Sequence, residues 1–206
     1  MSQSVKEFLV LCCLLNNLSM QTIYLASKSP RRRDLLKQLG VKFRLVIPEV
    51  SEKISERNPK RFAMRLARQK VESVEKNIKK GIIIGVDTVV VINNKILGKP
   101  KDKNDARMMI KLLSNKKHKV ISGLYILSKP NNRAILTSEM TKVKFRKLSD
   151  NEIEKYISSR EPYDKAGAYG IQGKAKIFIE NISGCYYNVV GLPIYQLLAC
   201  LKKIVY

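Results

Sequence analysis

The sequence predicts an α/β fold in which a mixed, largely twisted β-sheet is flanked by helices. Strand-like and helix-like segments alternate along the 206 residues, which favours helices packed in layers on a sheet. Two candidate hairpins, at Asn93-Asn94 and at residues 130–132, interrupt the alternation and argue against a purely parallel, doubly wound sheet. The length and an apolar fraction of 45% fit one domain, or two small lobes that share a cleft.

In the first half of the chain, turn and cap residues mark the element boundaries. Ser29 and Pro30 suit the N-terminal cap and first turn of a helix, and Gly40 suits the position beyond its end. Apolar residues at helical spacing follow Pro59, and the run at 82–92 is the strongest strand signal. The elements expected are a strand at 23–26, a helix from 30 to about 39, a strand at 41–47, a helix from 59 to about 78, and a strand at 82–92 that turns back into 95–97.

Further caps define the elements of the second half. Asp102 suits the cap of a helix, and Ser149 with Glu152 forms a capping box for another. The elements expected are a helix from 102 to about 113, strands at 120–127 and 134–145 joined by a turn at 130–132, a helix from 149 to about 159, short strands and loops at 167–191, and a terminal helix from 193 to about 204.

The formal net charge of +23 indicates an anionic partner without choosing among partners. A field this positive attracts RNA, an anionic membrane and phosphorylated small molecules alike. The basic residues are scattered along the chain rather than gathered in one block, so we assign most of them to a solvated surface. A basic RNA-binding module is the rival hypothesis, weakened because the chain has no Trp to stack bases and no RRM or KH signature.

Cysteine and histidine usage argues against a zinc site and against nucleophilic hydrolases. His118 is the single histidine, and because it lies among lysines we interpret it as an exposed loop residue. Without it no Ser-His-Asp or Cys-His set can form. The four cysteines lack C-x-x-C spacing and are expected to be reduced thiols of a cytoplasmic protein. They are Cys12, Cys13, Cys185 and Cys200.

Residues 1–20 are interpreted as a poorly ordered extension ahead of a folded domain at 21–206. The apolar run at 8–15 resembles a signal-peptide core but is too short to span a bilayer. Glu7 and the lack of a small-x-small site before Met20 argue against a cleaved leader, and Met20 as the true initiator is the other interpretation. We therefore expect no association with a membrane.

The junction between the first strand and the first helix is a candidate phosphate site. It reads Ser27-Lys28-Ser29-Pro30-Arg31-Arg32-Arg33. The free N–H groups and the dipole of a helix N-terminus favour an anion, whereas arginines in the first turn are unfavourable unless an anion lies between them. A capped helix with solvated arginines is the alternative. The segment is not a P-loop, because G-x-x-x-x-G-K-S/T is absent.

Asp87 is the second candidate, because it interrupts an apolar run at 82–91. A buried carboxylate is costly unless a metal, a lysine or backbone donors pair with it. Gly85 would let another chain or a ligand approach closely. The hairpin at Asn93-Asn94 folds the chain back, so Lys99 of Gly98-Lys99-Pro100 could return to Asp87. An aspartate that faces water at a strand end is the alternative.

A glycine-rich segment at 161–173 is the remaining candidate. Its three glycines are interleaved with Lys165, Tyr169 and Gln172, a pattern that suggests a loop whose backbone approaches a ligand. Lys165 could meet a phosphate, and Gln172 could read a base edge. A structural cluster of turns is the alternative.

Together these motifs resemble the Maf family of nucleoside triphosphate pyrophosphatases, over nearly all of the chain after Met20. Each motif alone is modest, but the five occur in the family's order and spacing, which is highly specific. They are LASKSPRRRDLL at 25–36, GVDTVV at 85–90, GKP at 98–100, EPYDKAGAYGIQG at 161–173 and NVVGLP at 188–193.

The resemblance implies an ITPase-like fold with two lobes around a central cleft, often as a homodimer. It implies hydrolysis of a nucleoside triphosphate between its α- and β-phosphates, helped by Mg²⁺ or Mn²⁺. By position, Asp87 matches the catalytic aspartate that accepts a proton from water, and Glu52 matches an acid that holds the metal with Asp87, with Glu49 as the fallback. Lys99 matches a lysine of the catalytic site. The positions that match substrate-binding residues are Ser27, Ser29, Arg31, Arg32, Lys70, Thr88, Lys165 and Gln172.

The resemblance also implies which nucleotide base the substrate carries. Asp-Thr at 87–88 and Ile-Gln-Gly at 171–173 resemble the branch that takes dTTP and UTP, with Arg31, Thr88 and Gln172 at positions linked to base choice. A 7-methyl-GTP-preferring pyrophosphatase is the alternative. The chain departs from the residues common in the family at Lys28, Ser51 and Val86. A nucleoside triphosphate is thus the expected partner, with no stable nucleic acid partner.

Overall fold

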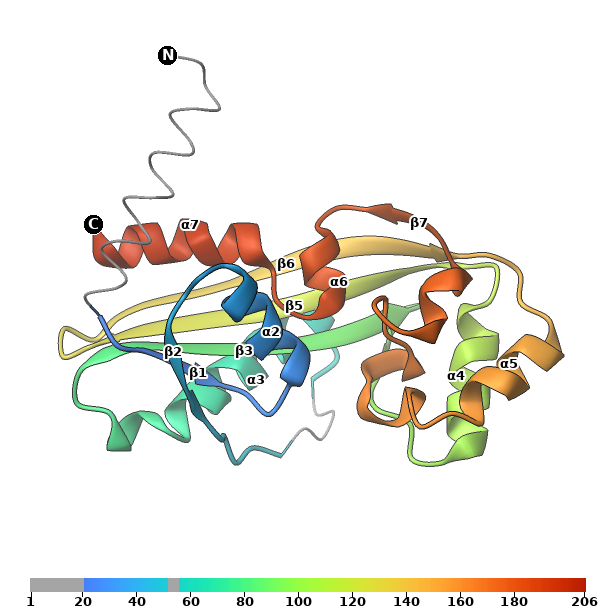
Figure 1. Cartoon of the computed structure of the whole chain (residues 1–206), viewed down its shortest axis with the longest axis horizontal. Helices are drawn as coiled ribbons and strands as arrows, with labels where there is room; N and C mark the ends of the chain where they lie inside the picture. The colour runs from blue at the N-terminus through green and yellow to red at the C-terminus, as the bar shows by residue number, and fades with distance from the viewer. Residues whose placement is uncertain (1–20, 52–55) are drawn as a thin grey trace, which may run out of the picture.

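The computed structural model describes residues 21–51 and 56–206, and it confirms a mixed α/β sheet flanked by helices (Figure 1). The seven-stranded sheet has the order β2-β1-β3-β5-β6-β7, with β4 paired to β3. Its strands are β1 (Ile23–Ala26), β2 (Phe43–Val46), β3 (Gly81–Ile92), β4 (Lys95–Leu97), β5 (Lys117–Lys129), β6 (Arg133–Phe145) and β7 (Ile179–Ser183).

The helices begin and end largely where the caps predict. Asp102 accepts a hydrogen bond from the Asp105 N–H, and Ser149 and Glu152 form the expected capping box. Gly40 has a φ of 70° just beyond the end of the first described helix. The helices are α2 (Pro30–Gln38), α3 (Pro59–Glu72), α4 (Lys103–Leu113), α5 (Asp150–Ile157), α6 (Tyr186–Val190) and α7 (Ile194–Val205), with 3₁₀ turns η1 (Glu75–Asn77), η2 (Pro162–Asp164), η3 (Ala166–Ala168) and η4 (Lys174–Phe178).

One edge of β3 is shared by two short strands with a gap between them. β1 pairs in parallel with residues 82–85 of β3, and β4 pairs antiparallel with residues 90–92. Residues 86–89 lie between these two ladders, while β5 pairs along the whole opposite edge. The gap opens the sheet where Asp87 and Thr88 lie.

Three groups of helices cover the sheet (Figure 1). Because side chains alternate along β3, Ile82 and Ile84 face α2 and α7, whereas Val89 and Val91 face α3. A separate core at the far end of the sheet packs α4, α5 and the η3–η4 segment against the ends of β3, β5 and β6. The long strands β5 and β6 run through both ends, so the two cores share one sheet.

Two glycines let α3 lie unusually close to the sheet. A Cβ atom placed at Gly85 would lie 2.3 Å from the Ala67 carbonyl oxygen, and one at Gly123 would lie 2.3 Å from the backbone of Ala63. The open approach to Gly85 expected from the sequence is therefore taken by a helix of the same chain rather than by a ligand. Ala63 and Ala67 are fully buried in this contact.

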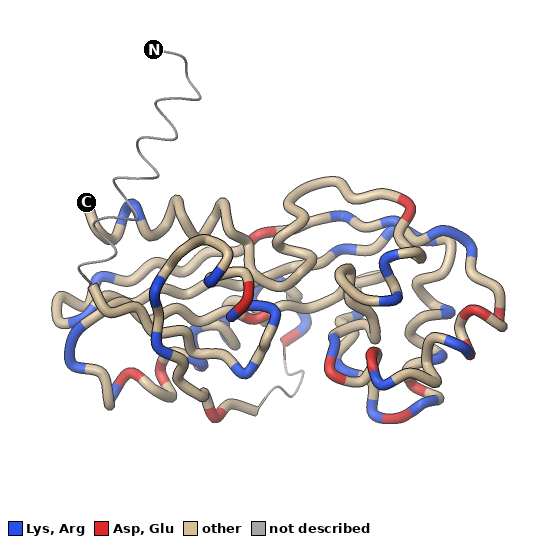
Figure 2. Tube along the Cα trace, in the orientation of Figure 1, with Lys and Arg blue, Asp and Glu red and all other residues tan. Residues whose placement is uncertain are grey.

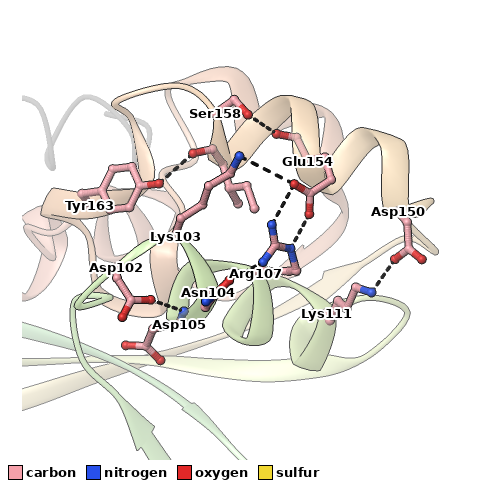
Figure 3. A network of polar contacts seen from close by, with 11 residues as sticks. Asp102, Lys103, Asn104, Asp105, Arg107, Lys111, Asp150, Glu154, Ser158 and Tyr163 are labelled. Atoms are coloured by element: carbon pink, nitrogen blue, oxygen red, sulfur yellow. Dashed lines mark hydrogen bonds and ion pairs between the residues drawn. The ribbon is translucent and has the colours of Figure 1, made fainter.

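A network of ion pairs joins α4 to α5 (Figure 3). Arg107 forks onto both carboxylate oxygens of Glu154, and Lys111 pairs with Asp150 at 2.7 Å. The Tyr163 hydroxyl donates to the Ile157 carbonyl at 2.8 Å, which ties the segment after α5 to the same pair of helices. The α4–α5 pair thus backs the glycine-rich segment.

Several boundaries differ from the sequence-based expectation. α3 ends at Glu72 and is followed by η1, so the apolar spacing out to Ile78 reflects two elements rather than one. β5 begins at Lys117, three residues before the predicted start. The interval 167–191 contains β7 and α6 as well as 3₁₀ turns.

Residues 1–20, with Cys12 and Cys13, lie outside the described residues. Within the described part, every helix is too short or too polar to cross a bilayer.

We expect Gly85→Ala to lower the free energy of unfolding by about 1–3 kcal/mol, because the added methyl overlaps the α3 backbone and overpacking costs this much. Urea unfolding followed by circular dichroism measures it. Gly40→Ala is the comparison, since its methyl meets nothing within 4 Å and only the positive φ is strained. Equal losses in the two variants would show that the close approach of α3 has no special cost.

Candidate active site

The gap in the sheet opens into a cavity of about 820 Å³ between the two ends of the molecule. Its walls come from segments far apart in the sequence: the β1–α2 junction, α3, the middle of β3, the end of β4, and residues 164–171 and 189–191. The fold therefore brings together the motifs that the sequence analysis considered one by one.

Asp87 and Lys70 form a buried ion pair on the wall that faces α3. The Lys70 Nζ lies 2.5 Å from the Asp87 Oδ1, and their side chains are only 8% and 9% exposed. Lys70 follows Phe62 and Leu66 at helical spacing, so it lies on the sheet-facing stripe of α3. The structure thus supplies the partner that a carboxylate in an apolar strand requires, and it is a lysine.

Thr88 lies on the opposite face of β3, beside α2. The buried guanidinium of Arg32 donates from Nη2 to the Thr88 Oγ1 at 3.1 Å and from Nε to the Gly191 carbonyl at 2.8 Å. The Thr88 and Ser122 hydroxyls, opposite each other in the β3–β5 ladder, share a hydrogen bond of 2.8 Å. Arg32 and Thr88 therefore join α2 to β3 and to the turn before α7.

The N-terminus of α2 meets the cavity as expected for an anion site. Ser27, Ser29 and Arg31 all line it, together with Lys28. Ser29 occupies the cap position without a side-chain capping bond, and its N–H donates to the Ser27 Oγ at 3.1 Å. The first turn of α2 holds no acidic residue, so its basic side chains oppose the helix dipole.

The facing wall carries Lys99, Asp164 and Lys165. Lys165 donates from Nζ to the Glu161 carbonyl and to the Asp164 Oδ1, both at 2.5 Å. Its side chain crosses Gly170, where a Cβ would lie 2.7 Å from the Lys165 Cε. The absence of a side chain at Gly170 therefore leaves space for Lys165 of the same chain. The sequence pattern did not indicate this contact.

Two residues predicted for the site do not line the cavity, and a third cannot be placed. Gln172 is exposed and lies outside the cavity lining. Glu52 falls outside the described residues, and its fallback Glu49 is exposed beside a second hollow next to α3. Residues 21–51 and 56–206 contain no group of three His, Cys, Asp or Glu side chains suited to holding a metal ion.

The interpretation of His118 as an exposed loop residue is wrong. It lies in β5 at 3% exposure, and its Nε2 shares a hydrogen bond of 2.7 Å with the hydroxyl of Tyr169, which lines the cavity. Burial lowers the pKa of His118 from 6.5 to about 4, so the ring is neutral near pH 7. Strand alternation explains its position, because Lys117 and Lys119 are exposed whereas His118 and Val120 are buried.

The sequence analysis did not single out Asp164, which lines the cavity, or Ser122 and Asn188, which support its walls from behind. Asn188 is fully buried and donates to the Val120 carbonyl and the Thr141 Oγ1, which fixes the chain just before the 189–191 wall. Asp164 and Asn188 lie in the motifs at 161–173 and 188–193, so a polar residue inside a motif was the signal that could have identified them. The place of Ser122 opposite Thr88 follows from strand register, which a single sequence does not reveal.

Comparisons with known proteins identify the family of the chain. A family model described as Maf-like protein matches residues 22–204. A protein of Carboxydothermus hydrogenoformans named dTTP/UTP pyrophosphatase is 50% identical over 88% of this chain and 97% of its own length. One of Clostridium botulinum (strain Kyoto) with the same name is 49% identical over 89% and 97%. The Ham1 protein of Staphylococcus aureus shares the fold, with a TM-score of 0.52, 15% identity and coverage of 89% and 100%.

The buried His118 predicts a loss of stability in mild acid. Its folded pKa lies below the unfolded value, so between about pH 6.5 and 4 the unfolded chain binds a proton that the folded chain does not. Stability is therefore full above pH 6.5 and falls as the pH falls, by about 2 kcal/mol between pH 7.5 and 5. Urea unfolding at several pH values measures this.

The matched variant is His118→Gln, which keeps a polar partner for Tyr169 and removes the titration. We expect its stability to change less over the same interval. If the variant and the natural chain lose stability in parallel, the neutral buried histidine is not the cause.

Proposed function

The chain belongs to the Maf-like protein family, and from that premise we propose that it hydrolyses dTTP and UTP to the nucleoside monophosphate and pyrophosphate. The observation that carries the proposal is the charge of the cavity. Six basic residues and two acidic ones line it, so the described lining has a net charge of +4 (6 − 2), which complements a triphosphate. The basic residues are Lys28, Arg31, Arg32, Lys70, Lys99 and Lys165, and the acidic ones are Asp87 and Asp164.

In this proposal the two walls hold the polyphosphate between them. The N–H groups at the start of α2, with Ser27, Ser29 and Arg31, bind phosphate oxygens from one side. Lys99 and Lys165 bind from the other. Preorganised donors of this kind stabilise the charge that grows as the phosphoanhydride breaks.

Asp87 acts as the general base. It accepts a proton from the water that attacks phosphorus, and the bond between the α- and β-phosphates breaks to release pyrophosphate. Lys70 fixes the direction of the carboxylate through the 2.5 Å ion pair. The apolar surroundings of the pair support this role, because buried ionisable groups with a charged partner in a cleft are often functional residues.

The residues suit a divalent cation that arrives with the substrate. Mg²⁺ is usually bound by one or two carboxylates together with substrate phosphates, so a preformed cage of three side chains is not required. We propose that Asp87 and Glu52 hold it. When bound, Mg²⁺ or Mn²⁺ would neutralise phosphate charge and lower the pKa of a water ligand.

Base choice is proposed to lie with Thr88, Gln172 and Arg31. Thr88 supports this because its hydroxyl lies on the cavity wall in a polar group with Ser122 and the Gly191 carbonyl. Gln172 follows Ile171, which lines the cavity, and its exposed side chain is available to a bound base. The cytoplasm, where the nucleotide pool lies, is the proposed place of action, and a homodimer is expected from the family resemblance.

A panel of nucleotides tests the function. We expect pyrophosphate release from dTTP and UTP with Mg²⁺ or Mn²⁺. A chelator should abolish most of this activity, because the phosphate charge is then not neutralised. Release mainly from 7-methyl-GTP would support the alternative branch. Salt-sensitive RNA binding without pyrophosphate release from any nucleotide would support the basic RNA-binding module instead.

Asp87→Asn should reduce kcat by ~10²-fold or more, the range typical of a lost general base. The chain should still fold, at a lower free energy of unfolding, because Lys70 loses its charged partner. Steady-state pyrophosphate release from dTTP measures this, and circular dichroism checks the fold. Glu180→Gln is a suitable control, because it also removes a carboxylate from an ion pair, at 2.7 Å to Lys144, on an exposed strand away from the cavity. Near-natural turnover in Asp87→Asn would refute the assignment.

A further inference from the structure

Asp164 holds two of the cations that line the cavity. Its Oδ2 lies 3.1 Å from the Arg31 Nη1, and its Oδ1 lies 2.5 Å from the Lys165 Nζ. Each carboxylate oxygen is thus paired with a different cation. A phosphate group offers the same arrangement, because its oxygens share one negative charge and accept from a guanidinium and an ammonium together.

The two cations belong to opposite walls. Arg31 lies in the first turn of α2, while Lys165 follows η2 at the other end of the molecule, beside α4 and α5 (Figure 1). Asp164 therefore bridges the cavity at the place where the proposed function puts the polyphosphate. Figure 2 shows that Lys and Arg positions are spread over the described part of the trace, so this bridge concerns only a small part of its positive charge.

This bridge differs from the Lys70–Asp87 pair in burial. The Asp164 side chain is 57% exposed, against 9% for Asp87. Exposed ion pairs are weak and are screened by salt, so an anion with more charge displaces them readily. Burial raises the pKa of Asp164, but hydrogen bonds from Lys165 and Arg31 outweigh this and leave the pKa below its usual value. The carboxylate is therefore charged at neutral pH and competes with a phosphate.

We propose that Asp164 is an internal competitor of the substrate, which occupies Arg31 and Lys165 in the empty site and gives both up to the triphosphate. The inference rests on the proposed function for the nature of the ligand. It makes Asp164 a determinant of affinity that acts through two other residues. The same exchange, run in reverse, helps pyrophosphate to leave, because the carboxylate takes back the two cations.

A double-mutant cycle tests this. The variants are Asp164→Asn, Arg31→Gln and their combination, and the probe is α,β-methylene-dUTP, which cannot be cleaved between the α- and β-phosphates. Calorimetry gives each Kd. We expect Asp164→Asn alone to bind about three- to tenfold more tightly, the size that two exposed ion pairs allow. In the Arg31→Gln background this gain should fall to about half on a logarithmic scale, because one of the two displaced partners is absent.

Kinetics gives an independent measurement. In Asp164→Asn, KM for dTTP should fall by a similar factor and inhibition by pyrophosphate should strengthen, while kcat is unchanged or lower because product leaves more slowly. Asp150→Asn is the matched control, since it also removes one carboxylate from an exposed pair, with Lys111 at 2.7 Å, far from the cavity. We expect it to change neither Kd nor KM.

Three results would overturn the inference: unchanged or weaker binding in Asp164→Asn, an equal gain with and without Arg31, or the same gain in Asp150→Asn. An equal gain in affinity with and without Arg31 would mean that Asp164 weakens anion binding only through its negative charge, and not through its contact with Arg31. Inorganic tripolyphosphate serves as a second probe without a base. If the natural chain releases no pyrophosphate from any nucleotide, the proposed function fails, while the cycle with tripolyphosphate still decides the role of Asp164.

Discussion

The site depends on the ion pair between Lys70 and Asp87, which both side chains form almost out of contact with water. Burying either charge alone would cost several kcal/mol, so neither residue is stable in its place without the other. The pair forms only because α3 lies close to β3, and that approach requires the absence of side chains at Gly85 and Gly123. The ion pair at Asp87 is thus linked to helix packing two residues earlier in the same strand.

The sequence was informative where a single residue conflicts with its local pattern. A carboxylate in the apolar run of β3 predicted a buried partner, and caps at Asp102 and Ser149 located two helix starts. The identity of the partner was less accessible. Lys70 lies at helical spacing from Phe62 and Leu66, but a lysine at an apolar position has no fixed meaning until the facing strand is known.

Failures of the sequence analysis have a common physical cause, which is that pairing and packing are decided by distant segments. His118 lies between lysines and was assigned to a loop, whereas it belongs to β5, pairs with Val143 of β6 and is buried. Gly85 was interpreted as room for another chain or a ligand without a choice between them, and α3 of the same chain fills that space. Lys165 likewise fills the space at Gly170, a contact that the glycine-rich pattern alone does not indicate. Three-dimensional neighbours, rather than local propensity, determined each of these positions.

The gap at residues 86–89 explains how two adjacent residues can serve different parts of one substrate. Successive side chains of a strand point to opposite faces, so Asp87 faces α3 whereas Thr88 faces α2. In the interior of a sheet these faces would be separated by the backbone of the neighbouring strand. Here β1 ends at Ala26 and β4 begins to pair only at residue 90, so the edge of β3 is open between them and both side chains line one cavity. A ligand that touches both must therefore lie across the open edge of β3, with one part on the α3 side near Asp87 and another part on the α2 side near Thr88.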